Sequence, residues 1–404
     1  MSLLSRLEHR FSTRDQLLDG WLMLAALTLA AIGWVMVTSA STEVAASSTG
    51  NPYYYSIRHG IYIVLGFIAC MVVMRVPMSW WRANGPTFFL VGLILLVATP
   101  VMGHAVNGAR RWIPLGIINL QSSEVAKICL VVYLAGYMVR HIERVRNTWS
   151  GFSVPLALVF IQGALLILEP DYGSTVVVLS AAMGMLLMAG VRLWRFALLS
   201  GGVIVLGVFV AFAEPYRVQR ITSYLDPWAN QYASGYQLTQ ALIAFGRGGW
   251  TGTGLGNSIQ KLFFLPEAHT DFVYSVLAEE LGLVGAVGVV ALFAILVYRA
   301  FRIGRTAELT GRLFSAFVCY GLAVIFGAQA FINLAVNTGM LPTKGLTLPL
   351  VSYGGSSMLI SGVMVGLLLR VDGETRAFLN TSRQGRKRRE RDDLRPFSGG
   401  DHHV

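Results

Sequence analysis

Residues 246–280 read GRGGWTGTGLGNSIQKLFFLPEAHTDFVYSVLAEE, and the change of character within this stretch decides the fold. Its first part is a polar loop rich in glycine, and its second part is an apolar run that still carries Glu279 and Glu280. An ionisable side chain inside a bilayer is costly and marks a functional site by default. The stretch therefore predicts an outer loop that turns into a membrane span, with the polar cluster 266–271 at the junction.

The composition of the whole chain also indicates a membrane protein. Of 404 residues, 54% are hydrophobic and only 13% are charged, whereas soluble domains carry about 25% charged residues. The isoelectric point of about 9.8 would suit a nucleic-acid partner, but the basic residues lie on alternate loops, which is how membrane topology is encoded. We therefore expect a polytopic helical membrane protein that contacts membrane lipids and no nucleic acid.

Several kinds of site are not expected. The three cysteines, Cys70, Cys129 and Cys319, lie inside apolar segments without CxxC spacing, which predicts neither a disulfide framework nor a zinc site. The glycine-rich run 246–256 follows no strand and matches no nucleotide-binding fingerprint. A backbone nest for a lipid diphosphate is left open there.

Apolar runs of about 17 to 25 residues, long enough to span a bilayer, recur along the chain and predict an all-α polytopic fold with ten transmembrane helices. The longest polar interval between them is the loop 214–270. Residues 1–17 carry apolar and charged side chains at helical spacing, which predicts an amphipathic helix at the membrane surface. The predicted spans are 19–40, 57–76, 86–103, 122–140, 152–168, 172–189, 194–213, 271–298, 312–334 and 353–370.

The basic residues orient these spans. Arg and Lys are much more frequent in the segments on the side of the N-terminus than in the opposite loops, so both termini are predicted to be cytoplasmic. The loops 104–121, 214–270 and 335–352 then lie on the periplasmic side. We expect three parts of the chain: an interfacial segment 1–18, a membrane domain 19–370 and a basic, disordered tail 371–404.

Asp271 stands where the large loop meets the eighth span. One interpretation is a helix N-cap or an acid in the first helical turn, where the helix dipole favours a negative charge. The other is a general base at the mouth of a lipid-facing cleft. Glu279 lies eight residues further on, roughly 12 Å deeper at 1.5 Å per residue, and Glu280 points to the opposite side. We expect at least one of these glutamates to pair with another helix.

A second polar block precedes the fourth span. Glu124 and Lys127 are three residues apart on one helix and can form an ion pair, which would make both tolerable in lipid; a direct role in the site is the alternative. Arg110 and Arg111 could hold a phosphate, with Trp112 at the level of the lipid headgroups. The alternative is that all three are interfacial anchors.

Two further outer blocks are rich in turn-forming residues. In EPDYGST at 169–175, Asp171 after Pro170 is a helix-start signal, and a role in shaping the cleft is secondary. In GMLPTKGLTLPLVSYGGSS at 339–357, prolines and glycines predict a fixed, non-helical path that re-enters the membrane surface. Lys344 is the only charge in that loop.

Five blocks together resemble the SEDS family, named for shape, elongation, division and sporulation. They occur in family order and cover nearly the whole chain apart from its tails. The PEAHTDF sequence and the Lys344-Gly345 pair are more similar to the division branch, FtsW, than to the elongation branch, RodA. The blocks are NGARRWI at 107–113, QSSEVAK at 121–127, EPDYGST at 169–175, QKLFFLPEAHTDFVYSVLAEE at 260–280 and LPTKGLTLPLVSYGGSS at 341–357.

The resemblance implies a peptidoglycan glycosyltransferase that polymerises lipid II into glycan strands outside the cytoplasmic membrane, at the division septum. It implies a class B penicillin-binding transpeptidase (FtsI-like) as partner, together with other division proteins (FtsQ, FtsL, FtsB and FtsN-like). It also implies that Asp271 is the essential acid, that Trp112 is functionally sensitive, and that Glu124 and Lys127 are paired polar residues of a membrane cavity.

For the reaction, our hypothesis is that the 4-hydroxyl of an acceptor sugar attacks the anomeric carbon of a lipid-linked donor, with inversion and loss of undecaprenyl diphosphate. Asp271 is the candidate general base, and cations would stabilise the departing diphosphate. Assistance by a divalent cation is left open, and no other cofactor is expected. The candidate substrate-binding residues are Arg110, Arg111, Trp112, Glu124, Lys127, Arg247, Lys261, His269, Lys344 and Ser352.

Two other functions compete with this one. In a lipid II flippase, the intramembrane charges of Glu124, Lys127, Glu279 and Glu280 would line a translocation path, although the polar sequence is concentrated on one face. A noncatalytic scaffold that recruits division partners would tolerate the loss of Asp271.

Overall fold

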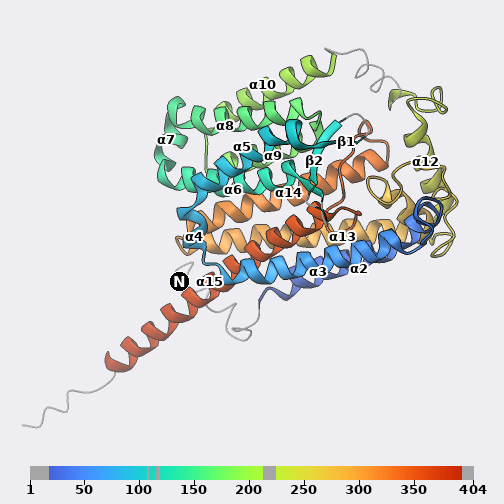
Figure 1. Ribbon diagram of the computed structural model, residues 1–404. Helices are drawn as coiled ribbons and strands as arrows, with labels where there is room; N and C mark the ends of the chain where they lie inside the picture. The colour runs from blue at the N-terminus through green and yellow to red at the C-terminus, as the bar shows by residue number, and fades with distance from the viewer. Residues whose placement is uncertain (1–17, 107–108, 115, 117–118, 213–223, 394–404) are drawn as a thin grey trace, which may run out of the picture.

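The computed structural model describes most of the chain, and the amphipathic helix predicted for residues 1–17 lies outside that part. Within it, the chain is helical apart from one small sheet and the outer loops (Figure 1). The described residues are 18–106, 109–114, 116, 119–212 and 224–393.

Each of the ten predicted apolar runs falls on a helix, so the all-α membrane fold is confirmed. Eight of the helices, counted among the described residues, are long and apolar enough to cross a membrane, and α9 is a shorter apolar helix of 17 residues. Ten crossings therefore stay a prediction. The ten helices are α2 (Gly20–Thr49), α3 (Tyr54–Arg75), α5 (Gly85–Met102), α6 (Ser122–Arg140), α8 (Trp149–Leu168), α9 (Tyr172–Met188), α10 (Leu193–Phe212), α13 (Val273–Leu309), α14 (Leu313–Asn337) and α15 (Gly355–Asp393).

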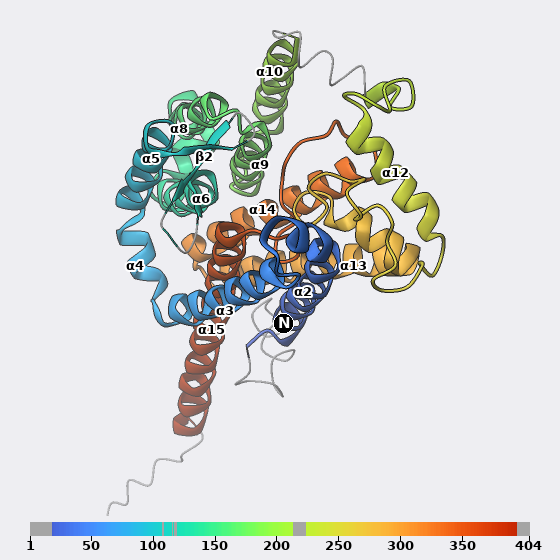
Figure 2. The same ribbon diagram turned by 45° about the vertical axis from the view of Figure 1, so that its right-hand side comes forward.

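The bundle has a buried centre and exposed flanks. α6, α14 and the first part of α15 bury most of their apolar stretch, whereas α3, α5 and α13 bury only 28% of theirs. α13 packs along α14, α15 along α3, and α5 along α6, while α10 lies beside α9 at the edge (Figure 2). Three short helices connect the long ones: α4 (Met78–Ala83), α7 (Ile142–Asn147) and α12 (Tyr236–Gly248).

Glycines bring α3 and α15 into direct backbone contact. A Cβ atom added at Gly362 would lie 2.1 Å from the carbonyl oxygen of Gly66, and one added at Gly66 would lie 2.9 Å from that of Met358. Lipid gives helices no hydrophobic reason to associate, so close backbone approach of this kind is a main source of packing energy in a membrane.

The loop predicted for 104–121 contains a small antiparallel sheet. Its strands β1 (His104–Val106), β2 (Ala109–Pro114) and β3 (Asn119–Gln121) lie in that order. The backbone N–H of Gln121 donates to the hydroxyl of Ser356 in α15 at 2.9 Å. The sheet is therefore fastened to the outer end of the bundle.

α15 continues to Asp393, where a disordered tail was expected from residue 371. The extension is supported by ion pairs four residues apart, Arg370 with Glu374 and Asp372 with Arg376, each 2.9 Å long. Residues 394–404 of the predicted tail lie outside the described part of the chain.

The predicted span 271–298 is not one continuous helix. Gly282 has φ +68° and ψ −167°, which breaks α13 near its start. A Cβ atom added at Gly282 would lie 2.3 Å from the backbone nitrogen of Gly252, so the outer loop packs into the break. The Thr253 N–H donates to the carbonyl of Glu279 at 3.0 Å. A long-range backbone contact, invisible in the apolar pattern, thus interrupts the span.

The glycine contact between α3 and α15 predicts a position-specific loss of stability. Gly362→Ala should destabilise the protein by about 1–3 kcal/mol, the usual cost of overpacking, and lower its apparent melting temperature in detergent. Gly288→Ala in α13 is the control, because a Cβ atom there meets nothing within 4 Å. Equal melting temperatures for the two variants would contradict this packing.

Candidate active site

Asp271 lies two residues before the start of α13 and is held by α14 and by the loop between α14 and α15. Its backbone carbonyl accepts hydrogen bonds from the side-chain amides of Asn333 and Asn337, each 2.9 Å long. A Cβ atom added at Gly345 would lie 2.7 Å from Asp271 Oδ2, so glycine lets the loop backbone approach the carboxylate. The N-cap of α13 is Phe272, with no capping side chain, and its first turn holds no acid. The interpretation of Asp271 as an N-cap or first-turn acid is therefore wrong.

A tight turn presents Asp271. Glu267 has φ +57°, which is uncommon for a residue with a side chain, and its carbonyl accepts from the N–H groups of Thr270 and Phe272 at 3.2 Å. The Thr270 hydroxyl donates to the Glu267 carboxylate at 2.7 Å. Ala268 and Phe272 are buried. The apolar members of this cluster anchor it, while Glu267 is exposed and Asp271 is partly buried.

The surroundings of Asp271 raise the pKa of its carboxyl to about 7. Burial is the largest cause; the charge of Glu267 adds to it, Arg111 opposes it, and Asp171 adds a smaller repulsion. The residue keeps part of its surface exposed. A partly accessible carboxyl that titrates near neutral pH is suited to act as a general base.

Strand β2 directs its two arginines to different partners, because successive side chains alternate across a strand. Arg111 is half-buried and donates from Nε to the carbonyl of Glu169 at 3.2 Å and from Nη2 to that of Pro170 at 2.6 Å. Arg110 is exposed and donates to the carbonyl of Pro100 at 3.0 Å. Arg111 is therefore the arginine that belongs to the acidic site. Trp112, also half-buried, is in register with Gln121 of β3.

The turn between α8 and α9 adds two acids. Asp171 accepts from the Ser174 N–H at 3.1 Å and caps α9, as predicted. Burial raises the pKa of the Glu169 carboxyl to about 8, although the Ser122 hydroxyl, 3.1 Å away, opposes this by donating to it. The side-chain amide of Gln121 lies 3.4 Å from Asp171 Oδ2. These contacts join the turn to the block that precedes α6.

The loop between α14 and α15 follows the non-helical path predicted for it and brings Lys344 near the α8–α9 turn. The Lys344 ammonium lies 5.7 Å from the centroid of the Tyr172 ring, within the range of a cation–π interaction. Ser352 is buried, and its hydroxyl accepts from the Leu348 N–H at 2.8 Å. Ser352 thus shapes the loop, and the substrate contact predicted for it stays a prediction.

His269 packs the Asp271 segment against α3. Its ring centroid lies 4.8 Å from that of Tyr55 and 5.7 Å from that of Tyr353, and its carbonyl accepts from the Tyr353 N–H at 3.0 Å. Burial lowers the pKa of the imidazole, opposed by the charge of Glu267. The ring is therefore neutral at neutral pH and positions the site by packing.

Glu124 and Lys127 form the predicted ion pair. Lys127 Nζ lies 2.7 Å from Glu124 Oε1, and both side chains are almost fully buried. The amide of Gln329 in α14 lies 3.4 Å from the same carboxylate oxygen. Each charge is thus balanced within the bundle.

Arg247 and Lys261, predicted to bind substrate, have other partners. Arg247 of α12 pairs with Glu279 at 3.3 Å, which confirms that at least one of the two glutamates binds another helix. Lys261 Nζ donates to Glu280 at 2.9 Å, to Ser39 of α2 at 2.9 Å and to the carbonyl of Gly256 at 2.7 Å. All three ammonium hydrogens are engaged, so the structure does not support a role for Lys261 in binding a phosphate.

Three residues of the site are absent from the sequence-based candidates. Glu169 could be suspected only from its place before Pro-Asp in an outer turn. Asn333 and Asn337 are four residues apart on one face of α14, and this polar pair in an apolar helix is a signal that sequence can supply. Within the described residues, no cluster of three or more His, Cys, Asp or Glu side chains could hold a metal ion.

Comparison with known proteins identifies the family to which this chain is similar. The model of the FtsW/RodA/SpoVE cell cycle proteins matches residues 20–377. The probable peptidoglycan glycosyltransferase FtsW of Halomonas elongata is 63% identical over 378 residues, which are 93% of this chain and 96% of that protein. The protein of the same name from Hahella chejuensis is 50% identical over 365 residues, 90% of this chain and 92% of the relative.

Two solved structures superpose on this chain. A chain of a peptidoglycan synthase complex that coordinates polymerization and crosslinking superposes with a TM-score of 0.72 at 28% identity, covering 89% of this chain and 98% of that one. The rod shape determining protein RodA of Thermus thermophilus superposes with a TM-score of 0.64 at 27% identity, covering 88% and 96%. The chain therefore belongs to the FtsW/RodA/SpoVE family of cell cycle proteins.

Proposed function

We propose that this chain polymerises lipid II at the outer face of the cytoplasmic membrane, with Asp271 as the general base. The observation that carries the proposal is a carboxyl with a pKa of about 7, near Arg111 and against the loop that bears Lys344. Activity as a peptidoglycan glycosyltransferase is the function named for relatives that share up to 63% of their residues with this chain.

The reaction follows from the chemistry of the site. The 4-hydroxyl oxygen of the acceptor sugar attacks the anomeric carbon of the donor as its proton passes to Asp271. The bond from that carbon to the diphosphate breaks, the configuration inverts, and undecaprenyl diphosphate leaves. Arg111 and Lys344 balance the negative charge that develops on the diphosphate.

The chain is a multi-pass membrane protein, and the proposed orientation places this site in the periplasm and both termini in the cytoplasm. The excess of Arg and Lys on the N-terminal side supports that orientation. Because the structurally similar chain works in a complex that also crosslinks, we propose an FtsI-like class B transpeptidase as partner. FtsQ, FtsL, FtsB and FtsN-like proteins at the septum complete this proposal.

The described contacts count against a flippase. Glu124, Glu279 and Glu280 each lie within 3.3 Å of a basic partner, so their charges are balanced inside the protein instead of lining a path. Transbilayer movement of labelled lipid II in liposomes, without formation of glycan chains by the same preparation, would favour the flippase.

Replacing the base tests the mechanism. Asp271→Asn keeps the size of the side chain, and polymerisation of purified lipid II should fall by about 10²–10⁴-fold, the contribution of a general base. Asp226→Asn is the matched control, because Asp226 lies in the outer segment and caps a local turn at Ala229. Near wild-type product chains from folded Asp271→Asn that still binds its partner would reject the assignment. If that variant also supported division, the scaffold would be favoured.

The pH profile tests the electrostatics of the same group. The base must be ionised, so the rate should rise with pH through about 7, the pKa of Asp271. Glu267→Gln removes a charge that raises this pKa and should move the rising limb of kcat/KM to lower pH. Asp226→Asn should leave the limb in place. If the rising limb of kcat/KM is unchanged in the Glu267→Gln variant, a group other than Asp271 controls the pH dependence.

A further inference from the structure

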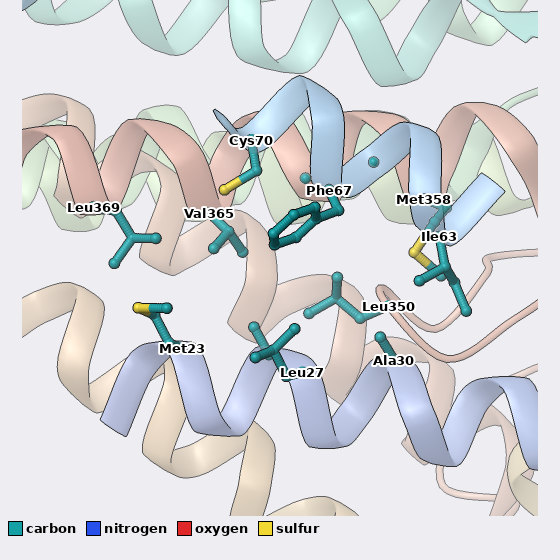
Figure 3. A pocket seen from close by; sticks show the side chains of 13 residues that line it. Met23, Leu27, Ala30, Ile63, Phe67, Cys70, Leu350, Met358, Val365 and Leu369 are labelled. Atoms are coloured by element: carbon teal, nitrogen blue, oxygen red, sulfur yellow. The ribbon is translucent and has the colours of Figure 1, made fainter. Parts of the chain in front are cut away.

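An apolar slot runs between α2, α3 and α15 (Figure 3). Its empty space, counted together with the part that is open to the outside, is about 570 Å³, and no side chain that lines it carries an oxygen or nitrogen atom. Polar groups that could hold water are therefore missing from its walls, and an apolar cavity of this kind stays dry.

The slot is elongated along the helices. On α15 its wall extends from Met358, close to the outer end of the helix, to Leu369, about 16 Å further at 1.5 Å per residue. In Figure 3, Ile63 lies near Met358 at one end, and Met23 lies near Leu369 at the other. A slot of this shape accommodates an extended hydrocarbon chain that runs down the bilayer from its outer surface.

The slot opens toward lipid. Leu27 and Phe67, which line it, are each 54% exposed, and both lie on helices apolar enough to cross a membrane. The surrounding medium at these positions is hydrocarbon, so an occupant can enter sideways from the bilayer.

One wall belongs to the loop that contacts the catalytic carboxylate. Leu350 lines the slot, is buried, and has φ +65°, a conformation that is a true outlier for so large a side chain. A Cβ atom added at Gly33 of α2 would lie 2.8 Å from the Leu350 carbonyl oxygen, so α2 packs against this part of the loop. Five residues earlier, Gly345 lies against Asp271.

We propose that this slot binds part of the polyprenyl chain of the lipid-linked substrate, while the sugar and diphosphate lie at Asp271. The inference rests on the proposed function and deepens it. A polyprenyl chain is favoured over a phospholipid acyl chain because one continuous loop forms both the slot wall and a wall of the site. A head group at Asp271 and a chain in the slot would then contact the same loop, through Gly345 and Leu350.

Filling the slot tests the proposal. Ala30→Phe puts a large ring into it, and initial rates are compared for lipid II with its full undecaprenyl chain and for an analogue with the same head group on a short prenyl chain. We expect KM to rise several-fold for the long-chain substrate, with kcat and the KM of the short-chain analogue unchanged. The control is Leu24→Phe, on the same helix but outside the slot and 56% exposed.

Equal changes of KM for both substrates, or none, would overturn the slot assignment and indicate occupancy by bulk lipid at most. Absence of polymerisation by the wild-type protein with both substrates would instead reject the proposed function. Photocrosslinking of the wild-type protein with a polyprenyl diphosphate bearing a diazirine near the middle of its chain is independent of any variant. Label should enter the segment that contains Phe67 and Cys70 and be competed by undecaprenyl diphosphate; competition by phosphatidylglycerol alone would overturn the proposal.

Discussion

The cost of taking a charge out of water is the constraint on which this structure depends. Inside the bundle, Glu124 and Lys127 meet that cost by pairing at 2.7 Å, and Glu280 does so with Lys261 at 2.9 Å. Asp271 differs from these residues. It forms no ion pair within the described part of the chain, and the pKa of its carboxyl rises to about 7. The same penalty thus makes the paired charges structural and leaves the Asp271 carboxyl able to exchange a proton near neutral pH.

Backbone placement, more than side-chain chemistry, brings the site together. Gly345 lets the α14–α15 loop touch the Asp271 carboxylate, and Gly252 lets the large outer loop enter the break in α13. Asn337 donates to the carbonyl of Asp271 and accepts from Ser275, so it fastens the start of α13 to α14. Segments far apart in the chain therefore converge on one outer face.

The similarity of this chain to peptidoglycan glycosyltransferases indicates why the site lies at the membrane surface. A lipid-linked donor never leaves the bilayer, so its reactive end must be met at the membrane surface while its tail stays in hydrocarbon. The proposed site and slot divide these tasks. One loop is shared by both, with Gly345 at the acid and Leu350 at the slot.

The sequence by itself determined the helices, the membrane class and the local pairs, because hydrophobic runs and the spacing of Glu124 and Lys127 act over a few residues. It also singled out Asp271 through a familiar motif. Only the tertiary structure decided that Arg247 and Lys261 neutralise glutamates, that Ser352 stays inside its loop, and that Arg111 meets the acidic turn. These assignments depend on contacts between distant segments, where desolvation and geometry select partners that no local pattern encodes.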